Sequence, residues 1–318
     1  MPRTGDAETS GQPARRGLTW GRTVRIVFIG IVVVVLARTV VLEGPDLRNA
    51  LERLDVGSVL TAGALMGLAQ VALWQSWHAL LRGTGAPVPR PRDSALIFFV
   101  GQLGKYAPGG VWTVLAQAEL GATRKVTRAR GAVVGVASLI VLTVTGAAVG
   151  ALEILASPEA FAAYWWTLVL LVAGVLVLSP PLLNRLVRIA LRLTSRQTGT
   201  ITLDTRSILT SVAWCLGWWL AAGLQAWVLA RSLAPGAPPS TVVGGFALAW
   251  VIGLLVVIAP AGVGVREAAL VLLLGGVLAA TDALTLGLVS RAVFIVGDLA
   301  SAVLVIGLRR RSTGSRSP

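Results

Sequence analysis

The sequence contains few of the residues that build disulfides, metal centres and catalytic sites. It has one cysteine (Cys215) and one histidine (His78) in 318 residues, which excludes a disulfide framework and a His/Cys metal cluster. It contains no Walker loop, no HExxH sequence and no nucleophile with a plausible base. We therefore expect a protein that is not an enzyme and that carries no metal or cofactor.

Charge is also scarce, and most of it has one sign. Charged residues make up 13% of the chain, whereas soluble domains contain about 25%. The 28 Lys and Arg outnumber the 14 Asp and Glu, which gives a formal net charge of +14. In a soluble protein this surplus would indicate nucleic-acid binding. Here the bases separate long apolar runs, an arrangement that orients membrane proteins, and we expect no nucleic-acid partner.

The apolar runs are long enough to cross a bilayer, which takes about 20 residues of helix. Ile26–Leu42 contains a single charge, Arg38, and its 25-residue leader is long for the alternative, a cleavable signal peptide. Ala283–Leu308 contains two charges, Arg291 and Asp298. The uncharged stretches are 56–77, 132–152, 164–183, 207–230 and 232–265. These runs predict an all-α polytopic membrane protein with about six full transmembrane helices.

Two further apolar segments are interrupted and predict broken or re-entrant helix pairs. Residues 94–120 hold two short apolar pieces separated by KYAPGG at 105–110. The sequence APAGVGVRE at 259–267 interrupts the segment 241–280 in the same way. Pieces of 10–14 residues are too short to span, and irregular backbone at membrane depth must be satisfied by protein or water. The sequence leaves open whether 241–280 is re-entrant or crosses twice.

The basic residues discriminate between topologies. If 94–120 enters and leaves the membrane by the same face, the five segments richest in Lys and Arg all lie on one side of the membrane. The positive-inside rule makes that side the cytoplasmic one. These segments are 1–25, 82–93, 121–131, 184–206 and 309–318. We therefore expect a multi-pass plasma-membrane protein with both termini in the cytoplasm. Residues 1–25 and 309–318 are expected to be basic tails, and both the polar first 20 residues and the RRRSTGSRSP tail are expected to be disordered.

A five-residue sequence recurs at an offset of 152 residues. Ala107-Pro108-Gly109-Gly110-Val111 returns as Ala259-Pro260-Ala261-Gly262-Val263. The same offset brings 56–81 onto the later span 207–230 and 132–152 onto 283–308, whereas 26–42 matches 164–183 imperfectly. With three membrane crossings per half, the second copy has the opposite orientation in the membrane. Residues 26–152 and 153–308 are thus predicted to be two inverted repeats, a transporter architecture, with chance recurrence in a glycine-rich chain as the alternative.

The first break carries candidate substrate-binding residues. Lys105 precedes Pro108, which suits the first turn of a helix, and Gly109 and Gly110, which allow close approach to backbone N–H groups. A cation beside a helix N-terminus can bind an anion. The alternative is that Lys105 extends to the cytoplasmic face and the Pro-Gly pair merely turns the chain.

The second break and the last span carry the remaining candidates. Neighbouring helical residues point about 100° apart, so we expect one of Arg266 and Glu267 to face a cavity and the other to brace a neighbouring helix. Arg291 and Asp298 share a helix face but lie about 10 Å apart. Each is therefore expected to reach another segment, and Arg291 with Glu267 is one option. Ionisable groups within a bilayer are costly and indicate function; purely structural ion pairs are the alternative. The candidates at the second break are Pro260, Gly262, Gly264, Arg266 and Glu267.

Other polar residues are better explained by the membrane interface. His78 lies near Trp74 and Trp77 at the predicted cytoplasmic end of its span, as in an interfacial aromatic belt. Four arginines at spacings of 3, 4 and 4 residues predict one face of an interfacial helix on anionic lipid. They are Arg185, Arg188, Arg192 and Arg196.

Three sequence features together resemble the integral-membrane, flippase-like domain of the lysylphosphatidylglycerol synthase family. They are GQLGKYAPGGVW at 101–112, PAGVGVREAALVLLL at 260–274 and the late Arg291. The similarity extends over roughly residues 20–308. In full-length synthases a soluble aminoacyl-transfer domain follows, whereas ten residues remain here after Leu308. The resemblance therefore implies a bacterial plasma-membrane protein with the lipid-translocating half and not the synthase activity.

Three functions remain, in order of preference. The first is a lipid flippase that moves an anionic phospholipid or lipid-linked headgroup through a polar cleft between the repeats. The second is a membrane partner that presents lipid to a separately encoded transferase. The third is an enzyme acting on polyprenyl-phosphate lipid, which would need a paired acid and base within reach of each other.

Overall fold

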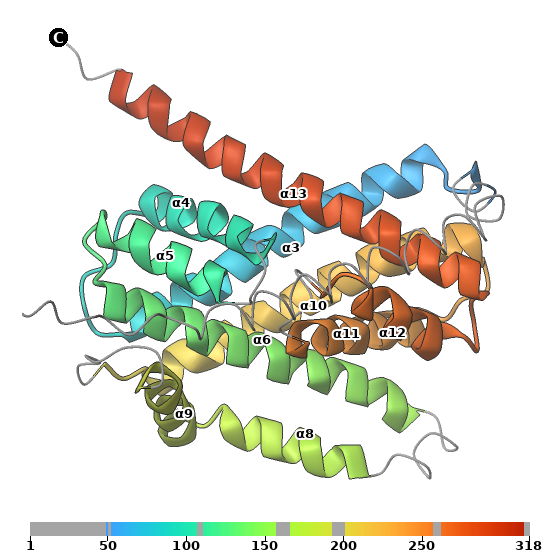
Figure 1. The fold of residues 1–318 in the computed structure, drawn as a ribbon, viewed down its shortest axis with the longest axis horizontal. Coiled ribbons are helices and arrows are strands. Elements are labelled where there is room, and N and C mark those ends of the chain that lie inside the picture. Colours follow the sequence, from blue (N-terminus) through green and yellow to red (C-terminus); the bar gives the residue numbers. More distant parts are fainter. Residues whose placement is uncertain are drawn as a thin grey trace, which may run out of the picture.

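The computed structural model describes residues 49, 52–106, 111–156, 166–192, 201–256 and 262–314, and within these ranges every regular element is a helix (Figure 1). The all-α prediction is confirmed for this part of the chain. The predicted span Ile26–Leu42 and the tail 1–25 lie outside it. In chain order the helices are α3 (Val56–Gly83), α4 (Pro91–Gln102), the 3-10 turn η1 (Leu103–Tyr106), α5 (Trp112–Ala122), α6 (Arg128–Ala156), α8 (Trp166–Val177), α9 (Pro180–Arg192), α10 (Thr205–Leu233), α11 (Pro239–Leu255), α12 (Val265–Leu274) and α13 (Ala280–Gly314).

Four helices are long and apolar enough to cross a membrane: α3, α6, α10 and α13. They coincide with the predicted runs 56–77, 132–152, 207–230 and 283–308. Helix α13 continues to Gly314, so the prediction of a disordered tail from residue 309 is wrong for 309–314. The prediction of one continuous span over 164–183 needs correction, because the chain bends by 81° between α8 and α9. Pro180 and Pro181 stand at the bend, and a proline there lacks the N–H that would continue α8.

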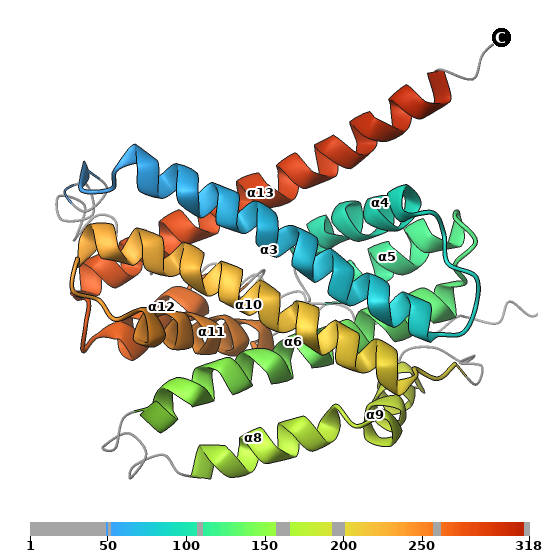
Figure 2. The ribbon, with the colours of Figure 1, turned by 180° about the vertical axis from the view of Figure 1, so that it is seen from behind.

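Helices α3 and α10 run antiparallel along their lengths (Figure 2). About two turns from the end of α3, the hydroxyls of Ser76 and Ser211 are 2.8 Å apart. At one end the N–H of Asp204 donates to the carbonyl of Gly83 at 3.4 Å. At the other end Ser232 Oγ contacts Asp55 Oδ2 at 3.2 Å. The two helices therefore lie side by side and run in opposite directions.

Both helices begin with the same cap. Asp55 accepts a hydrogen bond from the N–H of Ser58 at 2.8 Å, and Asp204 accepts one from the N–H of Ser207 at 2.7 Å. Such caps satisfy backbone donors that the first turn leaves open. The hydroxyl and N–H of Ser58 also hold the pKa of the Asp55 carboxyl below its ordinary value.

The short helices form two hairpins that bridge the long ones. In the first, α4 packs on α13 and α5 on α6; in the second, α11 packs on α6 and α12 on α13. A helix of 12 residues is only about 18 Å long, so neither α4 nor α5 can cross a bilayer alone. Gly101 and Gly253 lie where the arms of each hairpin approach closely. A Cβ on Gly101 would come within 2.5 Å of Gln117 Cγ, and one on Gly253 within 3.2 Å of Arg266 Cβ.

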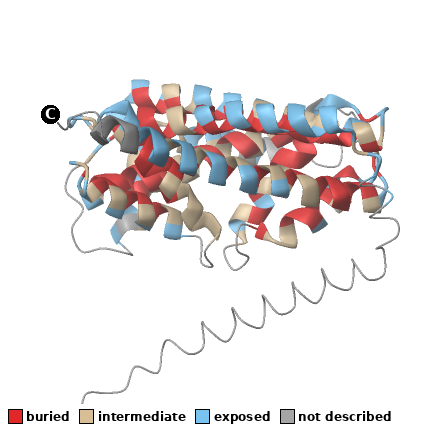
Figure 3. Cartoon of the chain, turned by 90° about the horizontal axis from the view of Figure 1, so that it is seen from above, coloured by how far each residue is buried: buried red, intermediate tan, exposed pale blue. Residues whose placement is uncertain are grey.

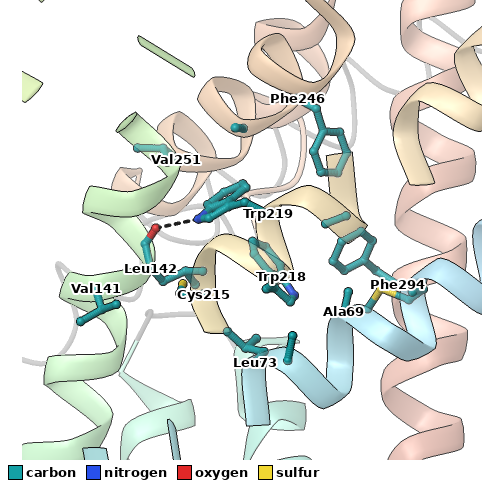
Figure 4. Close-up of a cluster of buried hydrophobic side chains, with 14 of the residues drawn as sticks. Ala69, Leu73, Val141, Leu142, Cys215, Trp218, Trp219, Phe246, Val251 and Phe294 are labelled. Carbon is teal, nitrogen blue, oxygen red and sulfur yellow. Dashed lines mark hydrogen bonds between the residues drawn. The ribbon is translucent and has the colours of Figure 1, made fainter. Parts of the chain in front are cut away.

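The core contains a cluster of aromatic side chains, shown in Figure 4. The rings of Trp218 and Trp219 meet edge to face at 4.5 Å between centroids, and both contact Trp250. The indole N–H of Trp219 donates to the Leu142 carbonyl at 3.2 Å, which ties α10 to α6. By contrast, the outward faces of the long helices are exposed (Figure 3) and carry large apolar residues suited to lipid, among them Leu60, Leu68, Leu220, Val296 and Val303.

We expect Gly146→Ala to destabilise the protein, whereas Gly217→Ala should not. A Cβ on Gly146 of α6 would lie 2.2 Å from the Trp219 ring, but one on Gly217 of α10 meets nothing within 4 Å. Overpacking a core costs about 1–3 kcal/mol, while replacing an unconstrained helical glycine gains up to about 1 kcal/mol. Melting temperatures of the two purified variants test this. Equal melting temperatures would contradict the packing of Trp219 on α6.

Candidate functional site

A cavity of about 130 Å³ lies between the two halves of the described chain. Space of this size can hold several water molecules. Its wall takes side chains from α3, α4, η1, α5 and α6 on one side and from α10 to α13 on the other. The aromatic lining residues are Phe98, Tyr106, Trp218, Trp250 and Phe294. The other polar lining residues are Gln70, Gln102, Lys105, Thr113, Gln117, Ser138, Arg266 and Arg291.

Asp298 of α13 joins three segments beside this cavity. Its carboxylate is buried and lies 2.7 Å from the Lys105 Nζ. It also accepts hydrogen bonds from the Gln70 amide of α3 and the Tyr106 hydroxyl of η1. A buried carboxylate is stable when it is paired and hydrogen-bonded in this way. Asp298 thus holds the broken segment after α4 against α3 and α13.

Glu267 forms the second buried ion pair. Its Oε1 lies 2.9 Å from Arg291 Nε and 2.7 Å from Arg291 Nη2, which confirms the pairing considered from sequence. Its Oε2 accepts the backbone N–H of Gly264 at 2.7 Å and so caps α12. Gly262 and Gly264 have φ of +69° and +81°, values that favour glycine. The turn before α12 therefore depends on these glycines and aims Glu267 at α13.

Arg266 is buried next to Glu267 but has different partners. Its guanidinium lies 4.5 Å from the Phe246 ring centroid and 5.2 Å from that of Phe294. Nη2 donates to Ser290 Oγ at 3.2 Å, while Nε is buried without an acceptor. As predicted, Arg266 faces the cavity while Glu267 braces α13.

The charges around the cavity do not balance within the described residues. Lys105, Arg266 and Arg291 all line it, but only two of these cations have carboxylate partners. Neither carboxylate lines the cavity itself. Trp218, another lining residue, also has a buried N–H without an acceptor. The site therefore offers a surplus cation and unused hydrogen-bond donors, which suit an anion.

The structure brings together most of the predicted site residues that it describes. Lys105, Arg266, Arg291 and Gly262 line the cavity, and of these cations Arg291 pairs with Glu267 and Lys105 with Asp298. Gly264 caps α12 instead of lining the cavity. Sequence reasoning missed several of the polar residues that line the cavity, among them Gln70. For Gln70 the sequence offered one signal, an amide side chain inside an apolar span. The predicted residues outside the described ranges are Pro108, Gly109, Gly110 and Pro260.

A family model described as "Lysylphosphatidylglycerol synthase TM region" matches residues 24–301. The chain belongs to this family. The resemblance inferred from GQLGKYAPGGVW and PAGVGVREAALVLLL is thereby confirmed. The match extends over α3 to α12 and most of α13, so both halves of the cavity are part of the lysylphosphatidylglycerol synthase transmembrane region. No curated protein matches the chain.

Proposed function

We propose that the protein is a lipid flippase that moves an anionic phospholipid or lipid-linked headgroup between leaflets. The observation that carries this proposal is Arg266, a buried cation without a carboxylate partner among the described residues, at a cavity between the two halves. A cation at bilayer depth costs about 2.5–3.5 kcal/mol on insertion scales. A lipid phosphate in the cavity would compensate that charge. The membrane family supports a lipid-related role.

The two halves are proposed to be inverted repeats that expose the cavity alternately to each face. The contact between α3 and α10 supports this, because it is reciprocal. The capped start of α3, at Asp55 and Ser58, meets Ser232 near the end of α10. The capped start of α10, at Asp204, meets Gly83 at the end of α3. A two-fold axis in the membrane plane relates such pairs, as in transporters that rock one repeat against the other.

We propose that the end of the molecule holding the end of α3 and the start of α10 faces the cytoplasm. Most described basic residues gather there: Arg82, Arg90, Arg92, Arg124, Lys125, Arg128, Arg185, Arg188, Arg192 and Arg206. Helix α9 lies at this end, with Leu183 and Val187 buried and its three arginines exposed. The amide of Asn184 fixes α9 to the backbone of Leu203 through hydrogen bonds of 2.9 and 3.0 Å. This arrangement suits an anionic lipid surface.

Cysteine labelling tests this orientation. Single cysteines at Arg90, Thr123 and Arg188, in a Cys215→Ser background, should resist an impermeant thiol reagent in intact cells. A cysteine at exposed Gly236, between α10 and α11 at the opposite end, should react. After lysis all four should react. Labelling at Thr123 in intact cells would contradict the re-entrant placement of α4 and α5.

We also propose that the site performs no covalent chemistry, because the two buried carboxylates beside the cavity, Glu267 and Asp298, are each paired with a cation and neither lines the cavity. Purified protein reconstituted into vesicles with a fluorescent phosphatidylglycerol analogue tests the proposed function. A flippase should give an outer-leaflet reductant access to nearly all of the probe, whereas empty vesicles should protect the inner half. Protection of half of the probe in protein-containing vesicles would refute the proposal.

A further inference from the structure

A second hollow, of about 340 Å³, lies between the end of α3 and the start of α10. Arg82 and Gly83 of α3 line it, and so do Arg206 and Ser207 of α10. Gly83 lets the two helices approach closely here, because a Cβ at this position would collide with the Ser207 hydroxyl. None of the lining residues also lines the cavity between the two halves. The hollow is therefore a separate site.

The hollow carries more positive than negative charge. Arg82 and Arg206 are exposed, and neither guanidinium pairs with a carboxylate or an acceptor among the described residues. The carboxylate in its wall, Asp204, accepts the N–H of Ser207 at 2.7 Å and so caps α10. The hydroxyls of Ser207 and Thr210 donate to backbone carbonyls at 2.9 and 2.7 Å. Two free guanidinium groups remain, and each can bind a phosphate through two N–H groups.

The lengths of the two helices place the hollow at the depth of lipid phosphates. Helix α3 has 28 residues and α10 has 29, which makes them about 42 and 44 Å long. The hydrocarbon core of a bilayer is about 30 Å thick, and about 40–45 Å with its headgroups. The ends of both helices therefore reach the headgroup region, where the hollow meets the phosphates of one leaflet.

An apolar path leads from the hollow along the outside of α10. Leu209, Leu216 and Leu220 follow Arg206 at spacings of 3, 7 and 4 residues, which places all four on one helix face. The three leucines are exposed. A phospholipid would use both parts of this surface, the arginines for its phosphate and the leucines for an acyl chain. A soluble phosphoester would use only the arginines, so the surface favours a lipid.

Helix α9 adds positive charge beside the hollow (Figure 2). Asn184 of α9 binds the backbone of Leu203, the residue before Asp204. The exposed face of α9 carries Arg185, Arg188 and Arg192 with Ile189 among them, and the helix contains no acidic residue. Basic pockets between membrane helices, next to basic amphipathic helices, are typical binding sites for anionic headgroups.

We infer that the hollow between the end of α3 and the start of α10 binds an anionic phospholipid as a resident ligand. Arg82 and Arg206 hold its phosphate, and an acyl chain lies on the leucine face of α10. This site goes beyond the proposed function, because it shares no lining residue with the cavity through which lipid is proposed to move. The bound lipid joins one helix of each half at this end of the molecule.

Quenching by brominated lipids tests the inference on the full chain in bilayers. A Leu209→Cys variant in a Cys215→Ser background carries a bimane label next to the hollow, and Val303→Cys on the exposed face of α13 is the reference position. The bilayers mix phosphatidic acid and phosphatidylcholine, one of which is brominated on its acyl chains. Phosphatidic acid should be preferred about threefold or more at position 209 and not at 303. Equal preference at both positions would overturn the inference.

Charge-matched variants assign the preference to the hollow. The double variant Arg82→Gln with Arg206→Gln should lose the preference at position 209. The control is Arg90→Gln with Arg92→Gln, which removes the same charge from exposed arginines near this end that do not line the hollow. It should keep the preference. Equal loss in both folded double variants would show a general attraction of basic residues to the membrane and would refute the site.

Two further measurements separate the possible ligands and the two functions. Inorganic phosphate should not displace the lipid more than sodium chloride of the same ionic strength, and stronger displacement would overturn the lipid assignment. A protein that keeps the preference at position 209 but moves no lipid across vesicles would refute the flippase and leave this site standing. Lipid movement without any preference at position 209 would do the reverse.

Discussion

Arg266→Ala should yield a folded protein that no longer moves lipid across a bilayer. The guanidinium forms no ion pair with a described carboxylate, so its removal leaves no buried acid without a partner. The variant loses the contacts with Phe246 and Phe294, and such a contact is worth about 2 kcal/mol where it is desolvated. It also loses a buried charge, and the desolvation of that charge opposes folding. We therefore expect a small change in melting temperature and a translocation rate at least tenfold lower.

Two further variants refine this prediction. Arg266→Lys should keep part of the activity, because the charge stays while the two-pronged guanidinium is lost. Arg231→Ala is the matched control, because Arg231 also lies over an aromatic ring, 5.4 Å from that of Trp227, but does not line the cavity. It should move lipid at the parental rate. A well-folded Arg266→Ala protein with parental activity would remove this residue from the mechanism.

Arg291→Met should have the opposite effect and prevent the protein from accumulating. Glu267 is buried, and Arg291 is its cationic partner at 2.7 Å. Breaking a buried pair by removing one partner costs about 3–5 kcal/mol, because the remaining charge is uncompensated. This is comparable to the whole stability of a marginal fold, about 5–15 kcal/mol. Yield of monodisperse protein and melting temperature measure the effect.

A second substitution should rescue this defect. Glu267→Gln removes the charge but keeps an oxygen that can accept the N–H of Gly264. The double variant with Arg291→Met therefore leaves no buried charge unpaired at this position. We expect it to accumulate close to the parental level, which separates loss of the pair from loss of packing. Normal accumulation of the Arg291→Met single variant would show that the pair does not stabilise the fold.

Local sequence signals predicted the long helices and the arrangement around the second break. Uncharged runs of more than 20 residues have few alternatives to a membrane helix, and α3, α6, α10 and α13 follow them closely. The spacing of Arg266 and Glu267 on one helix was enough to predict that they face different ways. The pairing of Glu267 with Arg291 was foreseen because few intramembrane charges were available as partners.

The features that sequence reasoning missed depend on contacts between distant segments. Asp298 meets Lys105 and Gln70 only because α13 packs on α3 and α4. Arg130 was counted with the basic loop 121–131, yet it is buried and donates to the carbonyls of Leu81, Ala86 and Pro87. The bend between α8 and α9 falls at two prolines, Pro180 and Pro181, inside the apolar run from which a single span was predicted.

The reciprocal contact between α3 and α10 has a consequence for the origin of the fold. The start of each long helix contacts the end of the other: Asp55 contacts Ser232, and Asp204 contacts Gly83. If the two halves are inverted repeats, as proposed above, this contact takes the form of an isologous interface, in which two identical subunits offer each other the same surface. Two copies of a single half-length ancestor, inserted into the membrane in opposite directions, could form this contact before any gene duplication joined them.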